Sequence, residues 1–261
     1  MRDFDLIVHQ FYGGQDITII PIADVHLGAA ECMEQDFVKF TQWLKDEPNV
    51  YITLGGDLID NGTKGSVTNP FRATMPPHQQ KKEMANLLAP IRDRILCIVP
   101  GNHERRSGKD ADDDPTYDIA AKLDLEDLYR ESMAFIKIQM GKDRNYPGQY
   151  RPTYTLVVTH GSGGGIFTGG AVNRNERFGY VIDGMDVLIT GHVHKPFTTQ
   201  PMKIKIDPHN NQVIMQPFKV VSAASWLNYG GYAMQKMLLP SGFCSQSIRL
   251  SGTKKHILVS M

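Results

Sequence analysis

Five short apolar segments in this chain each run directly into a polar motif that contains or adjoins glycine. Their length and their β-branched residues predict buried β-strands at residues 18–22, 50–54, 95–99, 154–159 and 187–190. Between the first two, apolar residues recur at helical spacing, as Phe37, Phe40 and Leu44 do within residues 34–45. Strands that alternate with helices in this way predict an α/β fold built from βαβ units.

The residues that follow these strands are of types that bind metal ions or phosphates. In chain order the motifs are Asp24-Val25-His26, Gly55-Gly56-Asp57, Gly101-Asn102-His103-Glu104, His160-Gly161 and Gly191-His192-Val193-His194. The carboxyl ends of the strands in an open α/β sheet form the crevice where ligands bind, so we expect these groups to converge there. A single Gly-Asp or Gly-Asn after a strand is usually a plain turn. Five such motifs in succession indicate one shared site.

The donor atoms in these motifs suit first-row divalent metal ions. Carboxylates, an amide oxygen and imidazoles without any thiolate favour Mn²⁺, with Fe²⁺ or Zn²⁺ as alternatives, over the all-oxygen sites of Ca²⁺ and Mg²⁺. The motifs hold more ligands than one ion needs, which predicts two ions. Two ions roughly 3.5 to 4 Å apart hold both oxygens of an in-line displacement and convert a bridging water into hydroxide. Hydrolysis of a phosphate ester at neutral pH needs both effects.

The ordered motifs resemble those of the calcineurin-like metallophosphoesterase superfamily, over about residues 17–195. The resemblance implies a four-layer αββα sandwich, in which two mixed β-sheets are flanked by helices. It implies that one metal binds Asp24, His26 and His194. It implies that the other metal binds Asn102, His160 and His192. Asp57 would then bridge the two ions.

The resemblance also implies roles for two residues outside the metal ligands. His103, next to Asn102, would be the histidine that steadies the phosphate or protonates the leaving oxygen as a general acid. Asp60 would orient His103. Both assignments are expectations that follow from the family and not from spacing.

Two departures from the family bear on the substrate. The first block, Asp24-Val25-His26-Leu27-Gly28, is similar to that of double-strand-break repair nucleases, whereas the Gly101-Asn102-His103-Glu104 block is similar to that of protein serine/threonine phosphatases. Asn61 stands where those phosphatases place a phosphate-clamping arginine, and the length leaves no room for the DNA-capping domain of those nucleases. A compact bacterial or phage type fits best.

We therefore expect the substrate to be a phosphoester in a nucleotide or nucleic acid. The alternatives are a phosphomonoesterase or a protein phosphatase and, from a different class, a metal-binding scaffold without catalytic activity. A serine hydrolase is excluded because Ser162 lies inside a glycine run and not in a Gly-x-Ser-x-Gly elbow. A nucleotide-binding P-loop is excluded because no Gly-Lys-(Ser/Thr) follows the glycines.

Substrate specificity is expected to come from two long loops, residues 61–77 and 161–175. Arg105 and Arg106, directly after the third motif, are candidates to bind a phosphate bidentately, with Asn102 beside them as a further substrate ligand. The alternative is that both arginines are solvated surface residues. The glycine-rich residues 161–165 have the freedom to bring backbone N–H groups near an anion, or to act as a flexible connector.

The last part of the chain has a different pattern from the first part. Short alternating segments at residues 202–206, 213–220, 233–239, 247–250 and 256–259 predict a second, mainly antiparallel sheet within residues 196–261. A turn at Asn210-Asn211 would join the first two segments. Upstream, Asp114 is expected to cap a helix that begins with Pro115. We expect residues 1–261 to form a single domain.

Composition excludes several other classes of protein. Lys+Arg and Asp+Glu are both 28, so the chain has no net charge to attract nucleic acid or acidic lipid, and any phosphate-binding charge must be local. Cys32, Cys97 and Cys244 show no metal-binding or redox spacing, which indicates reduced thiols. No signal peptide and no apolar run of about 18 residues are found. We expect a soluble, cytoplasmic protein that does not bind membranes, and the oligomeric state stays open.

Overall fold

The computed structural model describes residues 2–66, 69–141, 151–165, 167–242 and 245–261 of the chain. The strands of one sheet are β2 (Ile17–Ile22), β3 (Val50–Leu54), β4 (Ile95–Ile98), β12 (Ser247–Leu250) and β13 (Ile257–Ser260). The strands of the other are β1 (Ile7–Phe11), β5 (Met133–Met140), β6 (Thr153–Thr159), β7 (Val187–Thr190), β8 (Phe197–Thr199) and β11 (Lys219–Ser222). A separate hairpin pairs β9 (Met202–Asp207) with β10 (Gln212–Pro217).

The helices in the described residues are of two kinds. The α-helices are α1 (Glu34–Asp46), α2 (Pro77–Leu88), α3 (Asn102–Ala111), α4 (Pro115–Lys122), α5 (Thr168–Val181) and α6 (Gly231–Gln235). Short 3-10 turns are η1 (Arg2–Phe4), η2 (Pro70–Arg72), η3 (Ala89–Arg94) and η4 (Glu126–Leu128). None of the described helices is both long enough and apolar enough to cross a membrane.

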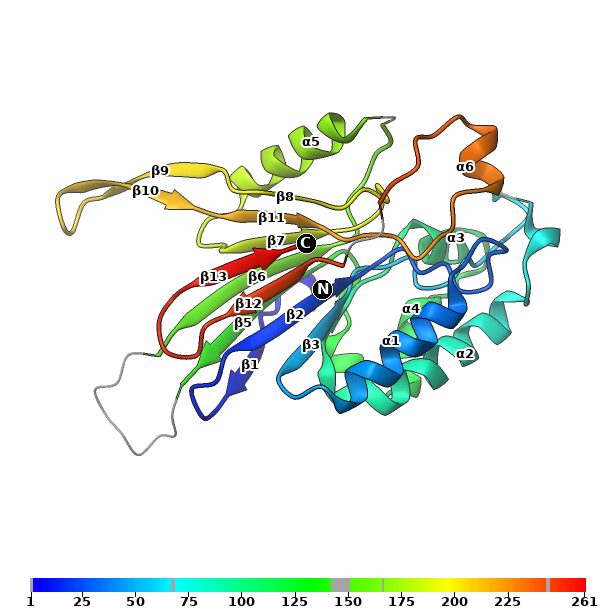
Figure 1. The fold of residues 1–261 in the computed structure, drawn as a ribbon, viewed down its shortest axis with the longest axis horizontal. Coiled ribbons are helices and arrows are strands. Elements are labelled where there is room, and N and C mark those ends of the chain that lie inside the picture. Colours follow the sequence, from blue (N-terminus) through cyan, green and yellow to red (C-terminus); the bar gives the residue numbers. More distant parts are fainter. Residues whose placement is uncertain (1, 67–68, 142–150, 166, 243–244) are drawn as a thin grey trace.

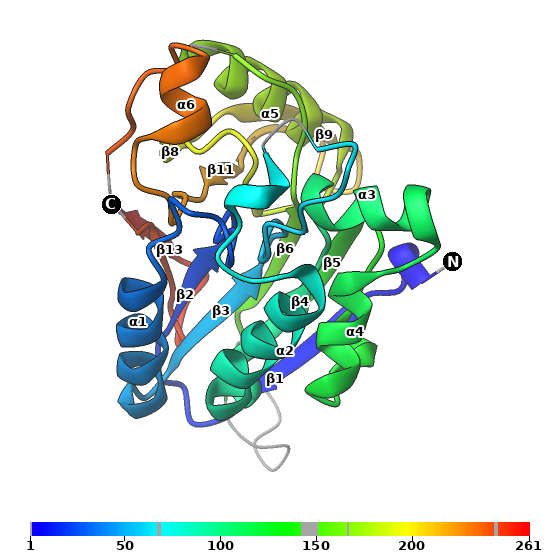
Figure 2. The ribbon, with the colours of Figure 1, turned by 90° about the vertical axis from the view of Figure 1, so that its right-hand side faces the viewer.

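Both sheets mix parallel and antiparallel pairs. The five-stranded sheet has the order β13-β12-β2-β3-β4, in which β2, β3 and β4 are parallel and β12 is antiparallel to its neighbours. The six-stranded sheet has the order β1-β5-β6-β7-β11-β8, in which β6, β7 and β11 are parallel. Figure 2 shows the arrowheads of β2 and β3 directed toward the same end of the molecule.

Three apolar clusters fill the spaces between four layers (Figure 1). Helices α1, α2 and α4 pack on one face of the five-stranded sheet, the two sheets pack together, and α5 covers the outer face of the six-stranded sheet. Ile20 packs under the helices and Ile19 between the sheets, because successive side chains of a strand point to opposite faces. The expected αββα sandwich with two mixed sheets is confirmed.

The five strands expected before the polar motifs are confirmed to within one residue at each end. They do not lie in one sheet, however, because β2, β3 and β4 belong to the five-stranded sheet and β6 and β7 to the six-stranded sheet. The expectations from the sequence omit strands β1 and β5 and helix α5, although β5 has the alternating pattern of a strand with one buried face. Because α5 begins at Thr168, Asn173, Arg174 and Asn175 lie on a helix and not in a loop.

The expectation of a separate antiparallel sheet within residues 196–261 is wrong. Strands β8 and β11 extend the six-stranded sheet, β12 and β13 extend the five-stranded sheet, and only β9 and β10 pair apart from both. The strand expected at residues 233–239 is replaced by α6 and by residues without regular structure. Hydrophobic alternation identified most of these strands, but it carries no information about which neighbour each one pairs with.

Two smaller expectations concern single residues. The side chain of Asp114 accepts a hydrogen bond from Tyr117 N, and Pro115 is the first residue of α4, so the predicted cap is confirmed. Cys32 and Cys97 are free thiols, and burial raises the pKa of each to about 12. Cys244 lies outside the described residues.

Candidate metal centre

The backbone turns sharply at the residues expected to bind metal. The φ angles of Asp24, His26, Asp57, His192 and His194 are 54°, 50°, 51°, 71° and 53°, all in the left-handed region. For residues other than glycine this conformation is uncommon, and it gathers at functional sites where surrounding contacts enforce it. Each turn carries a side chain out of the strand direction and into the space between the loops.

The loops after β2 and β3 are joined by backbone hydrogen bonds, and the loop after β4 packs closely against them. Asp24 N donates to Gly56 O at 3.0 Å, and His26 N donates to Asp57 O at 2.9 Å. Gly56 has φ 88°, and a Cβ atom there would lie 2.3 Å from the backbone nitrogen of Gly101. The glycine is therefore needed for the close approach of the second and third motifs.

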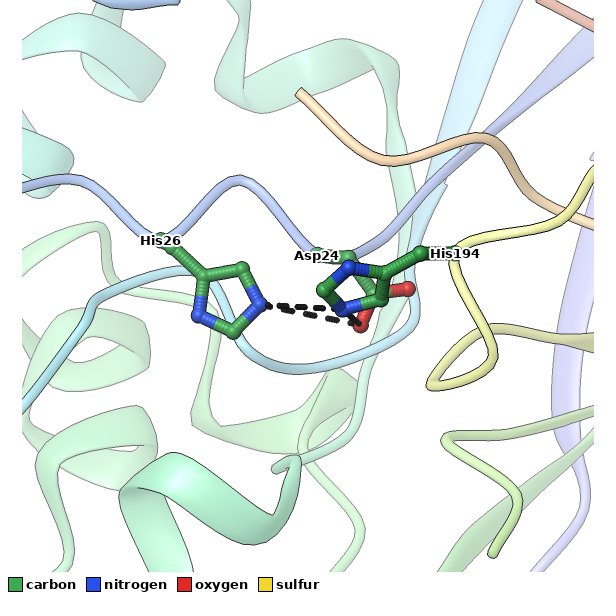
Figure 3. Close-up of side chains that lie close together, drawn as sticks. All are labelled: Asp24, His26 and His194. Carbon is green, nitrogen blue, oxygen red and sulfur yellow. Dashed lines mark hydrogen bonds and ion pairs between the residues drawn. The ribbon is translucent and has the colours of Figure 1, made fainter. Parts of the chain in front are cut away.

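Asp24, His26 and His194 form the first set of possible metal ligands (Figure 3). The Nε2 atoms of the two histidines are 3.3 Å apart, and Asp24 Oδ1 lies 3.2 Å from His194 Nε2 and 3.9 Å from His26 Nε2. Asp24 Oδ1 is buried and accepts no hydrogen bond from the described part of the chain. A buried carboxylate oxygen without a donor is costly unless a cation lies beside it.

Asp57, His160 and His192 form the second set. His160 Nε2 lies 3.3 Å from Asp57 Oδ2 and 3.2 Å from His192 Nδ1. The side-chain oxygen of Asn102 is 3.0 Å from the same His160 nitrogen, and the Asn102 side chain is exposed. The structure thus brings together the four residues expected around a second ion.

Asp57 lies between the two sets. Its Oδ2 atom is 3.8 Å from His26 Nε2 in the first set and 3.3 Å from His160 Nε2 in the second. The same oxygen is 4.0 Å from His103 Nε2. Among the carboxylates of the described residues, only Asp57 lies within 4.0 Å of histidines of both sets and of His103, which is the position that a bridging ligand would take.

Hydrogen bonds from the backbone fix one oxygen of each central carboxylate and leave the other directed at the histidines. Asp24 Oδ2 accepts from His192 N at 2.8 Å, and Asp57 Oδ1 accepts from His103 N at 2.8 Å. On the imidazole side, His160 Nδ1 lies 2.8 Å from Gly55 O and therefore carries a proton, which leaves Nε2 as the ring atom that faces Asp57. These contacts orient the donor atoms before any ligand binds.

His103 and Asp60 are held together beside this cluster. His103 Nδ1 lies 2.8 Å from the backbone oxygen of Asp60 and 3.4 Å from its Oδ1. With His26 they form a third set in which ligand atoms approach one another closely enough to hold an ion. This geometry allows two roles for His103: a proton donor next to the metal ligands, or a metal ligand itself. Metal content of the His103→Asn variant distinguishes these roles.

Glu104 is the residue of this centre whose role the sequence did not reveal. Its buried carboxylate accepts hydrogen bonds from three backbone nitrogens: Oε2 from Asp57 N and Gly101 N, at 2.9 and 2.8 Å, and Oε1 from Ile59 N at 3.1 Å. It therefore ties the second motif to the third. The motif contained Glu104, but only the fold shows that the side chain points away from the metal ligands.

The two arginines after the third motif point to different places. Arg106 donates to Ser66 Oγ and is close enough to act on the charges of Asp60 and His103. Arg105 is exposed and donates to the backbone oxygen of Glu131 at 3.1 Å. The structure thus brings Arg106 to the rim of the centre, whereas Arg105 bonds to the backbone of Glu131 outside it.

Asn61 stands where the protein serine/threonine phosphatases have a phosphate-clamping arginine. Its buried side-chain amide donates to His103 O at 2.8 Å and to Ser107 Oγ at 2.7 Å. Its backbone N–H donates to Gln80 Oε1 at 2.8 Å. Asn61 therefore supports the backbone of the third motif and does not face the site.

Burial is the largest influence on the titratable groups of the centre. It lowers the pKa of His26 to about 3, helped by the charge of His103. Burial acts on His160 too, but its hydrogen bond and charge interaction with Asp57 prevail and raise its pKa to about 9. For Asp57 the same partnership outweighs burial and lowers the pKa of the carboxyl. The pKa of His103 is raised, because Asp60 and Asp57 outweigh burial.

Residues 17–196 match the family described as calcineurin-like phosphoesterase. The DNA polymerase II small subunit of Pyrococcus abyssi is 30% identical over 104 residues, which cover 34% of this chain and 16% of that protein. The small subunit of Methanothermobacter thermautotrophicus is 27% identical over 101 residues, covering 34% and 21%. The chain thus matches only about a fifth or less of the length of these relatives.

Solved structures with a similar arrangement have low sequence identity to this chain. NAD nucleotidase from Haemophilus influenzae is 11% identical with a TM-score of 0.43, over 94% of this chain and 49% of that one. A metallophosphoesterase from Sphaerobacter thermophilus is 13% identical with a TM-score of 0.39, over 90% of this chain and 84% of that one.

We expect the metal-free protein to be most stable near pH 6.5, the ordinary pKa of histidine. The lowered pKa of His26 means that stability rises as the pH increases from about 3 to 6.5. The raised pKa of His160 adds stability below 6.5 that is lost as the pH rises through about 9. Urea unfolding in the presence of a chelator measures this dependence.

The matched variants are His160→Gln and His78→Gln, since His78 is exposed on α2. His160→Gln should flatten the alkaline side of the stability curve, and His78→Gln should leave it unchanged. A wild-type stability that keeps rising between pH 6.5 and 9 would contradict the raised pKa of His160.

Proposed function

The chain belongs to the calcineurin-like phosphoesterase family. We propose that it is a metal-dependent phosphoester hydrolase that works with two divalent metal ions on a phosphoester of a nucleotide or nucleic acid. The observation that supports two ions is the position of Asp57 Oδ2, between histidines of two ligand sets. Asp24, His26 and His194 would hold one ion. His160, His192 and Asn102 would hold the other.

The residues present fit such ions in three respects. Carboxylate, imidazole and amide donors suit Mn²⁺ first, and also Fe²⁺ or Zn²⁺. The buried Asp24 Oδ1 accepts no backbone N–H from the described residues and faces the imidazole of His194 at 3.2 Å, an arrangement that suits a shared cation. Imidazole nitrogens also face each other at 3.3 Å in one set and 3.2 Å in the other, an arrangement that a shared cation stabilises.

When bound, two divalent ions lower the pKa of a water and neutralise charge on the phosphate. His103 is placed to hold a proton at Nε2 and to give it to the leaving oxygen, because its Nδ1 already bonds to Asp60. The Asp60 carboxylate favours the protonated ring, and it also fixes the ring's orientation. Asn102 and His103 begin α3, and the dipole of a helix favours an anion near its amino end.

The preference for a nucleotide or nucleic acid is supported by three observations. The first motif is similar to that of the repair nucleases, and the relatives reported above are DNA polymerase subunits. Arg106 supplies a local positive charge at the rim of the centre. The zero net charge indicates few phosphate contacts, so short strands or ends should be preferred to long duplexes.

Asp57→Asn should abolish hydrolysis and weaken binding of both metals, because a neutral amide cannot bridge two dications as a carboxylate does. Metal content by mass spectrometry and hydrolysis of bis-p-nitrophenyl phosphate measure the two effects. Asp183→Asn is the matched control, since Asp183 is exposed. An Asp57→Asn protein with two bound metals and normal turnover would refute the bridging role.

His103→Asn should keep both metals and lower turnover roughly 10² to 10⁴ fold, the range of a lost general acid. The loss should be smaller for a p-nitrophenolate leaving group, which needs no proton, than for an alkoxide. His78→Asn is the control. Loss of metal in the His103→Asn protein would instead make His103 a ligand, as the third set of contacts allows.

Arg106→Gln should raise KM for an oligonucleotide about 10-fold. It should also lower the slope of log binding constant against log salt concentration by the contribution of about one phosphate contact. Arg105→Gln is a closely matched control and should change KM less than about two-fold. For the wild type, we expect the logarithm of the binding constant to fall linearly with the logarithm of the salt concentration. The slope should correspond to about two to four neutralised phosphates, each contributing roughly 0.7 to 0.9. Brisk hydrolysis of a simple phosphomonoester without cleavage of any nucleotide or nucleic acid would exclude this substrate class and leave the hydrolase intact.

A further inference from the structure

The hairpin of β9 and β10 carries one wholly apolar face. Residues directly opposite each other in an antiparallel pair share a face, and the register pairs Met202 with Pro217, Ile204 with Met215 and Ile206 with Val213. The exposed fractions of Ile204, Ile206, Val213 and Met215 are 73%, 72%, 69% and 56%. These six residues are called the hairpin face below.

The hairpin face is turned away from the body of the protein. On the opposite face of the hairpin, the ammonium of Lys203 bonds to the backbone oxygen of Ile182 and lies 5.2 Å from the centre of the Phe218 ring. The opposite side therefore meets the body at Lys203, whereas the apolar side meets solvent. Figure 1 shows the hairpin extending beyond the rest of the molecule. In a strand pair with one buried face, the apolar side chains normally face the body and the polar side chains face solvent, so this hairpin has the reverse arrangement.

Such a surface is unstable in isolation. A two-stranded hairpin is marginally stable in water, and contiguous apolar patches of this kind usually mark an interface. From the exposed fractions, the hairpin face offers roughly 500 to 600 Å² per copy. Two such faces packed together would bury about 1,000 to 1,200 Å², which reaches the lower range of specific interfaces.

We propose that the hairpin face is a dimer interface that binds the same face of a second copy of this chain. The face contains no charged residue, so it matches itself across a two-fold axis without bringing like charges together. The net charge of zero adds no long-range repulsion between two copies. A partner that binds through charged side chains would find no charged residue on the hairpin face.

The dimer leaves the metal centre accessible. Strand β10 leads into the amino end of β11, whereas His192 and His194 follow the carboxyl end of β7. Because β7 and β11 are parallel, the hairpin and the metal centre lie at opposite ends of the six-stranded sheet. The interface therefore does not compete with a substrate.

Sedimentation velocity from about 1 to about 100 µM tests the proposal. The wild type should form dimers within this range, as expected for an interface of this size. Ile206→Glu buries a charge in the hairpin face and should raise the dimer dissociation constant at least about 100-fold. Ile214→Glu is the matched control, because Ile214 lies on the opposite face, across from Lys205. It should dimerise like the wild type.

Hydrolysis of a chromogenic phosphate ester shows whether each variant is folded. If Ile206→Glu does not fold, Ile204→Gln provides a milder change on the same face, with an expected increase of about 10-fold. A wild type that stays monomeric at about 100 µM would overturn the proposal and leave the face to a different partner. A dimer that both glutamate variants weaken equally, or that neither weakens, would overturn it as well.

Discussion

The candidate metal centre depends on backbone that enters the left-handed region at five of its seven candidate ligands. For residues other than glycine this conformation costs about 1 to 2 kcal/mol each, so local sequence does not favour it. Contacts between loops supply the compensation: Asp24 N bonds to Gly56 O, and Trp226 N bonds to Asp24 O. The ligands keep their positions only while these loops stay packed, which makes the centre a property of the assembled sandwich.

Burial then gives the carboxylates their chemical character. Asp24 and Asp57 each use one oxygen to accept a backbone N–H and direct the other at histidines. Glu104 accepts three backbone N–H groups and faces away, so it serves the backbone alone. In a buried site, a carboxylate without such donors would be destabilised, and a cation placed among the remaining oxygens is correspondingly favoured.

The two ends of the six-stranded sheet are suited to different tasks. The carboxyl ends of β6 and β7 carry polar loops that meet those of the other sheet, where metal ligands converge. The opposite end continues into an apolar hairpin that no described residue covers on its outer side. The proposed hydrolysis and the proposed dimer formation would not interfere, because the two regions lie at opposite ends of the sheet.

The sequence by itself determined which strands exist before the motifs, the donor types, and the family, because strand length, alternation and motif order are local properties. It did not determine that β2 and β7 belong to different sheets, that Arg105 and Arg106 diverge, or that Glu104 binds three backbone nitrogens. Strand pairing and side-chain direction depend on residues distant in the chain. Only tertiary packing decided them, since hydrophobic alternation is the same whichever neighbour a strand finds.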